Sequence, residues 1–278
     1  MRIRVATAFS VCLIMVLSAA SAHAQYGRGL SDRATGETYN VEIGGYFWNP
    51  TPTIGISSES LPIVGQTATR IDFVNDLGIE KARFKQLKLV LRPATKHKFR
   101  FEYTPIKYTA GVDEPVTIRR DVIFNGIIFP VALPVETEMT WKAYRFAYEF
   151  DFIYRDRGFL GLVLEAKYTD VQATLTNIID TQFVHARAPI PAIGVIGRVY
   201  VAPNISITGE FGGFKLPEGI DEDYRAKYYD FDLYGTVNFS DNFGAQVGYR
   251  SFDVFYKIDQ DEGALVMKGL YFGGVARF

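Results

Sequence analysis

The segment between Tyr144 and Tyr154 constrains the fold of this chain more than any other. Aromatic side chains occupy every second position, and most of the intervening positions are charged or small: Arg145, Ala147, Glu149 and Asp151. Successive side chains of a β-strand point to opposite faces, whereas an α-helix would scatter these aromatics around its circumference. The pattern therefore predicts a strand with one aromatic face and one charged face.

Nine further segments alternate in the same way, around residues 39–43, 87–92, 99–104, 160–167, 195–201, 205–211, 228–239, 243–250 and 270–278. The connections between the ten segments are short at 93–96, 155–158, 202–204 and 240–242, and long at 50–83, 110–138, 170–190, 215–227 and 257–263. Short turns at one end, longer loops at the other and an even strand number are typical of membrane-spanning barrels. The sequence thus predicts an all-β fold, a transmembrane antiparallel up-and-down barrel of ten strands.

Two alternatives would change the strand count or the class of fold. The long loops contain apolar runs at 69–79 and, around an Asn-Gly pair, at 122–129. A membrane-spanning pair in either loop would raise the count to twelve, and eight strands is the lower alternative. A soluble β-sandwich would also contain alternating strands, but ten segments with alternating loop lengths favour the barrel.

A helical membrane span is excluded by the pattern of apolar residues. The best candidate after residue 24, residues 127–135, is short and contains Pro130 and Pro134. A membrane-spanning helix needs about 20 mainly apolar residues. If the chain crosses a membrane, it must do so as a closed barrel, because unpaired backbone groups are too costly in hydrocarbon.

The first 24 residues are typical of an export signal. Arg2 and Arg4 precede a mostly apolar run, and Ala22-His23-Ala24 has the small residues of a cleavage site. We expect cleavage after Ala24, a periplasmic extension at residues 25–36 and the barrel at 37–278. The only cysteine, Cys12, lies in the signal, so thiol chemistry is not expected in the mature chain.

Charge and aromatic content exclude one class of partner and fit one environment. The chain has 30 basic and 31 acidic residues; without Arg2 and Arg4 the mature chain carries about −3. Nucleic-acid binding usually needs a basic surface, so no such partner is expected. The 17 Tyr and 22 Phe residues suit the aromatic girdles of a membrane barrel.

The last segment, residues 270–278, alternates up to a terminal aromatic residue, Phe278. With the export signal and the ten alternating segments, the chain resembles the bacterial outer-membrane β-barrel superfamily. Asp76-Leu77-Gly78 and Phe124-Asn125-Gly126 also resemble a group of uncharacterised Gram-negative barrels with no known activity. The resemblance implies location in the outer membrane, contact with its lipids, and recognition of the C-terminal strand by the barrel-assembly machinery.

Charges of both signs share the faces predicted to point into the lumen. They are Lys88, Arg100, Glu102, Arg145, Glu149, Asp151, Glu165, Lys167, Arg198, Glu210, Asp230, Asp232 and Arg250. Hairpin registers predict three pairings, since opposite charges attract across a ladder: Arg250 with Asp232 or Asp230, Lys88 with Glu102, and Arg198 with Glu210. These charges form either a selective polar conduit or a network that fills a narrow barrel. We favour the filled barrel, because a small barrel has little interior to spare.

Catalytic and metal sites find little support. After the signal only His97 and His185 remain; His97 is expected at a solvated interface and His185 in a long extracellular loop. Omptin-type outer-membrane proteases use Asp and His at the extracellular rim, and Asp230, Asp232 and His185 supply those residue types in a different sequence context. The acidic stretches at 221–223 and 259–262 are expected to be solvated loops rather than calcium sites. No catalytic, cofactor or metal site is predicted.

We therefore predict a non-enzymatic outer-membrane protein, either a narrow passive channel for small solutes or a structural barrel. A surface-interaction barrel, acting like an adhesin through the loops at 50–83 and 110–138, is the first alternative. An outer-membrane hydrolase is the second. The sequence gives neither a solute nor an oligomeric state.

Overall fold

A computed structural model gives the structure of the chain. It describes residues 34–57, 70–112, 116–118, 121–124, 127–131, 133–179, 181–217, 224–258 and 261–278. The predicted export signal, residues 25–33 of the predicted extension, and the acidic stretch 221–223 lie outside these ranges. Their assignments stay predictions.

Ten long strands form a closed antiparallel barrel. They are β1 (Val41–Ser57), β3 (Phe84–Ala94), β4 (His97–Ala110), β8 (Pro134–Arg155), β9 (Gly158–Thr176), β10 (Thr181–Ala202), β11 (Ile205–Lys215), β12 (Tyr224–Asn238), β13 (Phe243–Ile258) and β14 (Asp261–Arg277). Each strand pairs with the next long strand along the chain, and β14 pairs with β1 to close the ring. The predicted fold class and the count of ten are confirmed.

Four short strands lie at one end of this barrel. β2 (Ile71–Asp72) pairs with β1, and β5 (Val116–Thr117) pairs with β8. β6 (Val122–Phe124) and β7 (Ile127–Phe129) form a separate two-stranded sheet. Because none of them joins the closed ring, the alternative of twelve membrane strands is wrong. In the described ranges, no helix has the length and apolar character of a membrane span.

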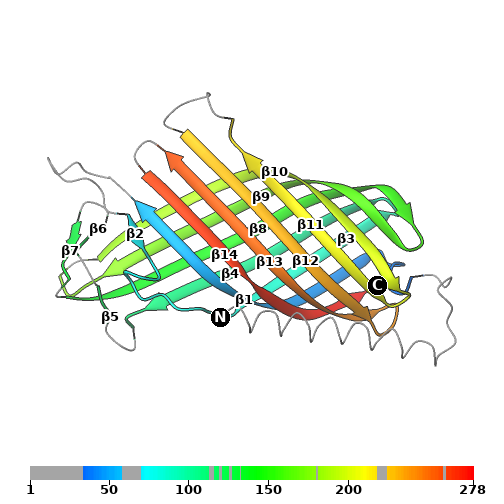
Figure 1. Ribbon diagram of the computed structural model, residues 1–278, viewed down its shortest axis with the longest axis horizontal. Coiled ribbons are helices and arrows are strands. Elements are labelled where there is room, and N and C mark those ends of the chain that lie inside the picture. Colours follow the sequence, from blue (N-terminus) through cyan, green and yellow to red (C-terminus); the bar gives the residue numbers. More distant parts are fainter. Residues whose placement is uncertain are drawn as a thin grey trace, which may run out of the picture.

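The two ends of the barrel differ, and Figure 1 shows them at opposite sides of the view. The turn end holds the short connections, such as the one from Arg155 to Gly158, and the C-terminal end of β14. The loop end holds β2, β5 and the β6–β7 hairpin. These two names are used below.

The strands run further toward the loop end than the alternation predicted. The connection predicted at 170–190 is mostly strand, because β9 continues to Thr176 and β10 starts at Thr181. The predicted loop at 50–83 likewise contains the last part of β1. Several outward positions here are polar, as at Asp170 and His185. Strand ends predicted from apolar outward faces therefore fall short of the observed strand ends.

A β-bulge breaks the alternation of β8 near the turn end. The register with β9 shifts between Phe150 and Ile153, and Phe152 and Ile153 are both exposed, at 43% and 46%. Tyr154 then turns inward, with its ring 5.1 Å from the Arg92 guanidinium. The prediction that Tyr154 shares the outer aromatic face was wrong, because a bulge inserts one unpaired residue.

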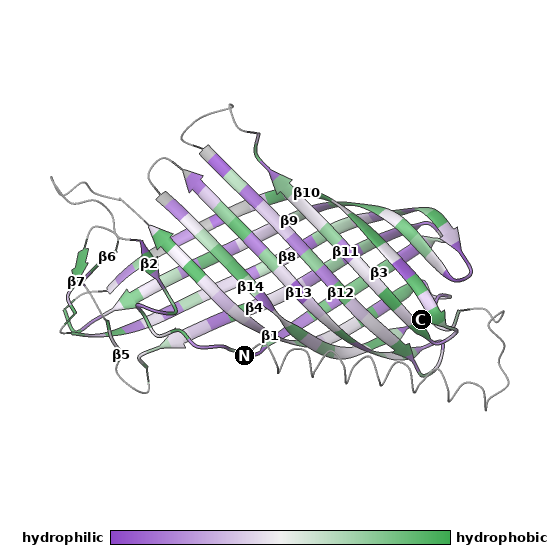
Figure 2. Ribbon diagram, viewed as in Figure 1, coloured by the Kyte–Doolittle hydropathy of each residue, from purple (hydrophilic) through white to green (hydrophobic). Residues whose placement is uncertain are grey.

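The outer face of the barrel is apolar in its middle band, and Figure 2 shows the alternation along the strands. Exposed residues of this band include Leu162, Phe231 and Val247. Toward the loop end, Tyr144 lies between the rings of Tyr103 and Tyr168, at 4.8 and 6.4 Å. Aromatic girdles of this kind mark the interfaces of membrane barrels.

Candidate functional site

The predicted lumen charges lie inside the barrel. All are buried except Arg250, whose side chain is 11% exposed. They come from alternate positions of β3, β4, β8, β9, β10, β11, β12 and β13. The pleat of each strand sends these side chains inward while their apolar neighbours face outward. The interior is therefore charged along the middle of the barrel.

Arg145 of β8 is the most connected cation of this layer. Its Nη1 lies 2.8 Å from Glu102 Oε1 on β4, and its Nε lies 2.5 Å from Glu165 Oε2 on β9. Its Nη2 contacts Glu210 of β11, a strand that is not a neighbour of β8 in the barrel. Arg100 of β4 also reaches Glu210, at 3.1 Å. Guanidinium groups thus join strands across the interior.

Three further ion pairs cross the lumen between strands that are not neighbours. Lys88 Nζ of β3 lies 3.2 Å from Asp232 Oδ2 of β12. Arg250 Nη1 of β13 lies 3.2 Å from Glu102 Oε2 of β4. Lys167 Nζ of β9 lies 2.6 Å from Asp230 Oδ2 of β12. Opposite walls are linked directly, which a wide pore would not allow.

The registers test the three predicted pairings. Asp232 lies opposite Arg250 in the ladder, but Arg250 turns to Asp230, at 2.6 Å, which was the second predicted partner. Lys88 lies opposite Glu102, with 3.9 Å between the charged atoms.

The third predicted pairing was wrong. The ladder places Thr208, not Glu210, opposite Arg198. Arg198 donates to Thr208 Oγ1 at 2.9 Å and pairs with Glu37 at 2.6 Å.

A second charged layer closes the turn end. Its members Arg198, Glu149 and Asp151 were predicted to lie in the lumen, whereas Glu37, Glu42, Lys98 and Arg277 were not. Glu37, which precedes β1, accepts hydrogen bonds from Arg198 Nη1 at 2.6 Å and from the Tyr200 hydroxyl at 2.8 Å. Burial by itself would raise the pKa of the Glu37 carboxyl, but the positive charges of Arg198 and Lys98 hold that pKa below its usual value. These contacts fix Glu37, in the segment before β1, inside the turn end of the barrel.

Other members of the turn-end layer lie on the strands themselves. Arg277 of β14 pairs with Glu42 of β1 at 2.6 Å. Lys98 of β4 pairs with Glu149 at 2.6 Å and with Asp151 at 2.9 Å. Lys98 and Arg277 share the inward parity of their strands, and that parity could have identified them. Glu37 lies outside any alternating run, so the sequence carried no signal for it.

The C-terminal residue takes part in closing the barrel. The Phe278 backbone N–H donates to Val41 O at 2.8 Å, and Val41 N–H donates back to Phe278 O at 3.0 Å. The Phe278 side chain is 64% exposed. Recognition of this strand by an assembly machinery stays a prediction.

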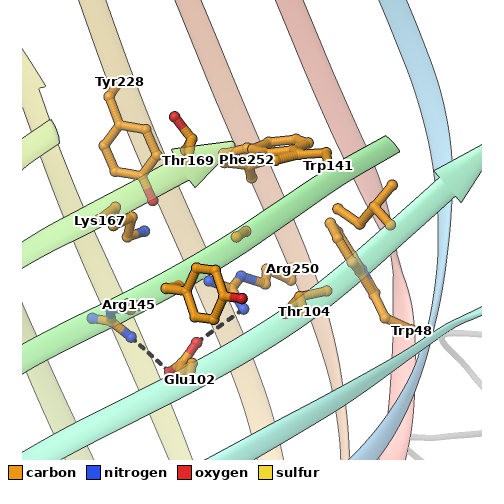
Figure 3. A pocket seen from close by; sticks show the side chains of 13 residues that line it. Trp48, Glu102, Thr104, Trp141, Arg145, Lys167, Thr169, Tyr228, Arg250 and Phe252 are labelled. Carbon is orange, nitrogen blue, oxygen red and sulfur yellow. Dashed lines mark hydrogen bonds and ion pairs between the residues drawn. The ribbon is translucent and has the colours of Figure 1, made fainter. Parts of the chain in front are cut away.

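Toward the loop end, aromatic rings cover the charged layer. Trp141 packs on Phe252 with ring centroids 4.7 Å apart, and Lys167 Nζ lies 4.1 Å from the centre of the Tyr228 ring. Figure 3 shows these rings on one side of a small cavity, with Glu102 bonded to Arg145 and Arg250 on the other. The cavity measures about 40 Å³, which is room for a few waters at most.

The interior of the loop end is mainly apolar. Phe73 and Leu77, which follow β2, and Phe124 and Phe129 of the β6–β7 hairpin are buried in the same cluster as Trp141. The loops at 50–83 and 110–138 therefore contain segments packed into the barrel mouth. Interior chemistry changes from ionic to apolar along the barrel axis.

The residues weighed as a catalytic group are not brought together. Asp230 and Asp232 lie in the lumen, whereas His185 lies on the outer face of β10. His185 Nε2 is 2.7 Å from Asp170 Oδ1, and Arg187 Nε is 3.2 Å from Asp170 Oδ2. The expectation that His185 sits in a loop was wrong, because β10 extends through it.

His97 and Glu262, which lies in the acidic stretch at 259–262, each make a polar side-chain contact. His97 Nδ1 lies 2.6 Å from the Tyr148 hydroxyl on the outer face near the turn end. Glu262 pairs with Arg70 at 3.3 Å. Among the described residues, no group of three or more His, Cys, Asp and Glu side chains could hold a metal ion.

Comparisons with known proteins show the fold alone. No model of a known family matches the sequence, and no curated protein matches it. The outer membrane protease OmpT from Escherichia coli is similar in structure, with a TM-score of 0.59 and 9% identity over 90% of this chain and 100% of that chain. The chain therefore has the fold of an outer-membrane β-barrel.

Two other solved structures are more distant. Ail, the attachment invasion locus protein of Yersinia pestis, gives a TM-score of 0.38 and 9% identity over 84% of this chain and 99% of that chain. An outer membrane channel from Pseudomonas putida F1 gives a TM-score of 0.39 and 10% identity over 90% of this chain and 99% of that chain.

Proposed function

We propose that the protein is a structural barrel of the bacterial outer membrane, without enzymatic activity and with a lumen that ion pairs keep closed. The turn end faces the periplasm and the loop end faces the exterior, as in barrels with short periplasmic turns. The apolar outer band contacts lipid. Of the two functions predicted first, this proposal favours the structural barrel over the passive channel.

The observation that carries the proposal is the set of ion pairs between strands that are not neighbours. Arg250 illustrates it, since it joins Glu102 at 3.2 Å and Asp230 at 2.6 Å. In a water-filled pore, charges on facing walls would be solvated separately and screened by salt. Here the charged side chains are largely buried and pair with each other instead of with water. Both signs are present in the same layer, so the lumen also offers no net field for selecting an ion.

Conductance in planar bilayers tests this function. We expect no steady conductance from the wild-type protein and measurable conductance from Arg250→Ala, which removes a link across the lumen. Lys107→Ala is the matched control, because Lys107 pairs with Glu138 outside the lumen, with side chains 58% and 43% exposed. A steady wild-type conductance in which Arg250→Ala merely shifts ion preference would replace the proposal with an open pore.

A surface-interaction role is the second candidate, favoured by the ordered packing of the loop end. Phe124 and Phe129 are buried, so the β6–β7 hairpin is held in one place above the barrel mouth. A rigid surface element suits recognition better than a mobile loop. Replacing residues 121–131 with a Gly-Ser linker should leave the barrel folded and abolish adhesion of expressing cells to a host-cell layer. Adhesion that persists would exclude this role for the hairpin.

A further inference from the structure

The loop end of the lumen contains an apolar cavity of about 360 Å³. It lies beyond the aromatic rings that cover the charged layer. Lining residues at inward strand positions include Ile54, Met139, Trp141, Val171, Val254 and Leu265. Ligand pockets in proteins typically measure about 300–1,000 Å³, and an apolar cavity of about 150 Å³ already accommodates benzene. This cavity is therefore large enough for a small apolar molecule.

The cavity is separated from the charges below it. Trp141, which is 2% exposed, forms part of its floor, and Tyr228 places its ring between the cavity and Lys167. The Tyr228 hydroxyl donates to Asp230 at 2.9 Å, so its polar end points toward the charged layer. Four cationic residues, Arg187, Arg225, Lys227 and Lys257, also line the cavity. Arg187 pairs with Asp170 and Lys227 pairs with Asp253. The rest of the lining is mainly rings and aliphatic side chains. The uncharged part of this lining suits a hydrocarbon, because a charged group placed there would lose its hydration without gaining a partner.

One wall of the cavity is a seam in the barrel. β10 pairs with β9 as far as Thr181 opposite Thr176, but with β11 only as far as Ile193 opposite Gly213. In the described part of the chain, no strand pairs with the other edge of β10 between residues 181 and 192. Pro189 lies in this edge, and proline is suited to an unpaired edge because it has no N–H to donate.

The seam gives access from the side. Pro191 of β10 and Leu216, just after β11, line the cavity from the two sides of the seam. Directly toward the turn end, Ile193 and Phe211 face outward and are 60% and 48% exposed. The seam thus begins where the apolar outer band ends. A hydrocarbon at the membrane surface can reach the cavity without passing through the charged layer.

We propose that this cavity binds a hydrocarbon group, which enters through the seam between β10 and β11. The group belongs either to a free apolar molecule or to an acyl chain of a surrounding lipid. Both sources supply the same chemistry, so the experiment must separate them. The proposal does not depend on conductance, and its failure would leave the closed-lumen function untouched.

Bromine quenching of Trp141 fluorescence tests the proposal. The chain has two Trp residues, so Trp48→Phe leaves Trp141 as the only indole. One arm adds 1-bromooctane to protein in vesicles of unbrominated lipid, and the other uses vesicles whose lipids carry bromine on their acyl chains. Saturable quenching in the first arm identifies a free molecule as the occupant. Quenching in the second arm identifies a lipid chain.

Filling the cavity supplies the control. In the Trp48→Phe background, Val254→Phe and Val171→Phe each fill part of the cavity, whereas Val195→Phe adds the same volume on the outer face, where Val195 is 47% exposed. We expect at least tenfold weaker quenching in the filled variants and no change in Val195→Phe. Two filled variants are used so that one misfolded protein, recognised by its electrophoretic mobility before and after heating, does not decide the test. No quenching in either arm, or equal quenching in the folded filled variants, would overturn the proposal.

Discussion

On β8, Arg145 in the middle of the lumen contacts three carboxylates, whereas Trp141, four residues toward the loop end, packs on Phe252. The same strands thus build an ionic interior and an apolar interior in sequence along one axis. The ionic part joins opposite walls and leaves little space. The apolar part is less completely filled and keeps a cavity of about 360 Å³. The ionic part of the lumen therefore holds the strands together, whereas the apolar part leaves space for a ligand.

The largest effect is expected from Arg145→Ala in the ionic part. Removing this guanidinium leaves Glu102, Glu165 and Glu210 without a shared partner, and breaking a buried ion pair costs about 3–5 kcal/mol. Urea unfolding in lipid vesicles measures the loss. Arg145→Met should cost as much, because it restores volume but not charge. If Arg145→Met were as stable as wild type, packing rather than charge would hold this layer.

The apolar part should respond to volume instead. Met139→Ala, at a side chain 2% exposed, should cost about 2–5 kcal/mol through lost contacts and a larger cavity. Met139→Leu nearly conserves volume and should cost less than about 1.5 kcal/mol. The same unfolding measurement applies to both. Equal losses for the two variants would mean that Met139 does more than fill space.

The turn-end layer gives a dependence on pH. Because the folded-state pKa of Glu37 lies below its usual value of 4.5, its stabilisation is present above that value and is lost as pH falls through the folded-state pKa. Hydrogen bonds to a charged group contribute about 1.5–3 kcal/mol. Glu37→Gln should therefore be less stable than wild type at pH 7, and the difference should shrink below pH 4.5. A difference that grows as pH falls would reverse the assignment.

The smallest effect is expected outside the lumen. Lys107→Ala removes a pair with Glu138 that lies on the exposed surface, and such pairs are worth about 0.2–1 kcal/mol. High salt should reduce even this loss in urea unfolding, since exposed charges are screened. A loss comparable to that of Arg145→Ala would show that burial does not separate the two regions.

The fold could be predicted because a strand's two faces repeat every two residues. That period identified ten strands, and it placed Asp232 opposite Arg250 in the ladder. It could not show that Arg250 reaches Glu102 across the lumen, because contacts between distant strands depend on the stagger of the closed barrel. The bulge in β8 and the position of Glu37 were missed for a related reason. Glu37 lies outside any alternating run, and the only sign of the bulge is the apolar Ile153 at a position where the alternation calls for a polar or small residue.

The end of each strand was also hard to predict. β9 continues past Tyr168, and β10 starts before Pro189, the residue opposite Tyr168; several outward side chains in this stretch are polar. Backbone pairing holds these residues in strands, whereas the apolar signal depends on contact with lipid. The cavity at the loop end escaped prediction because its seam arises from unequal strand lengths, with β10 extending beyond the end of β11.

A double-mutant cycle between Lys88 and Asp232 tests the central claim most directly. Their charged atoms lie 3.2 Å apart, on strands from opposite sides of the barrel. Lys88→Ala, Asp232→Ala and the double variant are unfolded in urea in lipid vesicles, and the coupling free energy is taken from the cycle. A closed lumen predicts a coupling of about 1–3 kcal/mol. Additive losses, within about 0.3–0.5 kcal/mol, would show that the two walls act independently and would contradict the closed lumen.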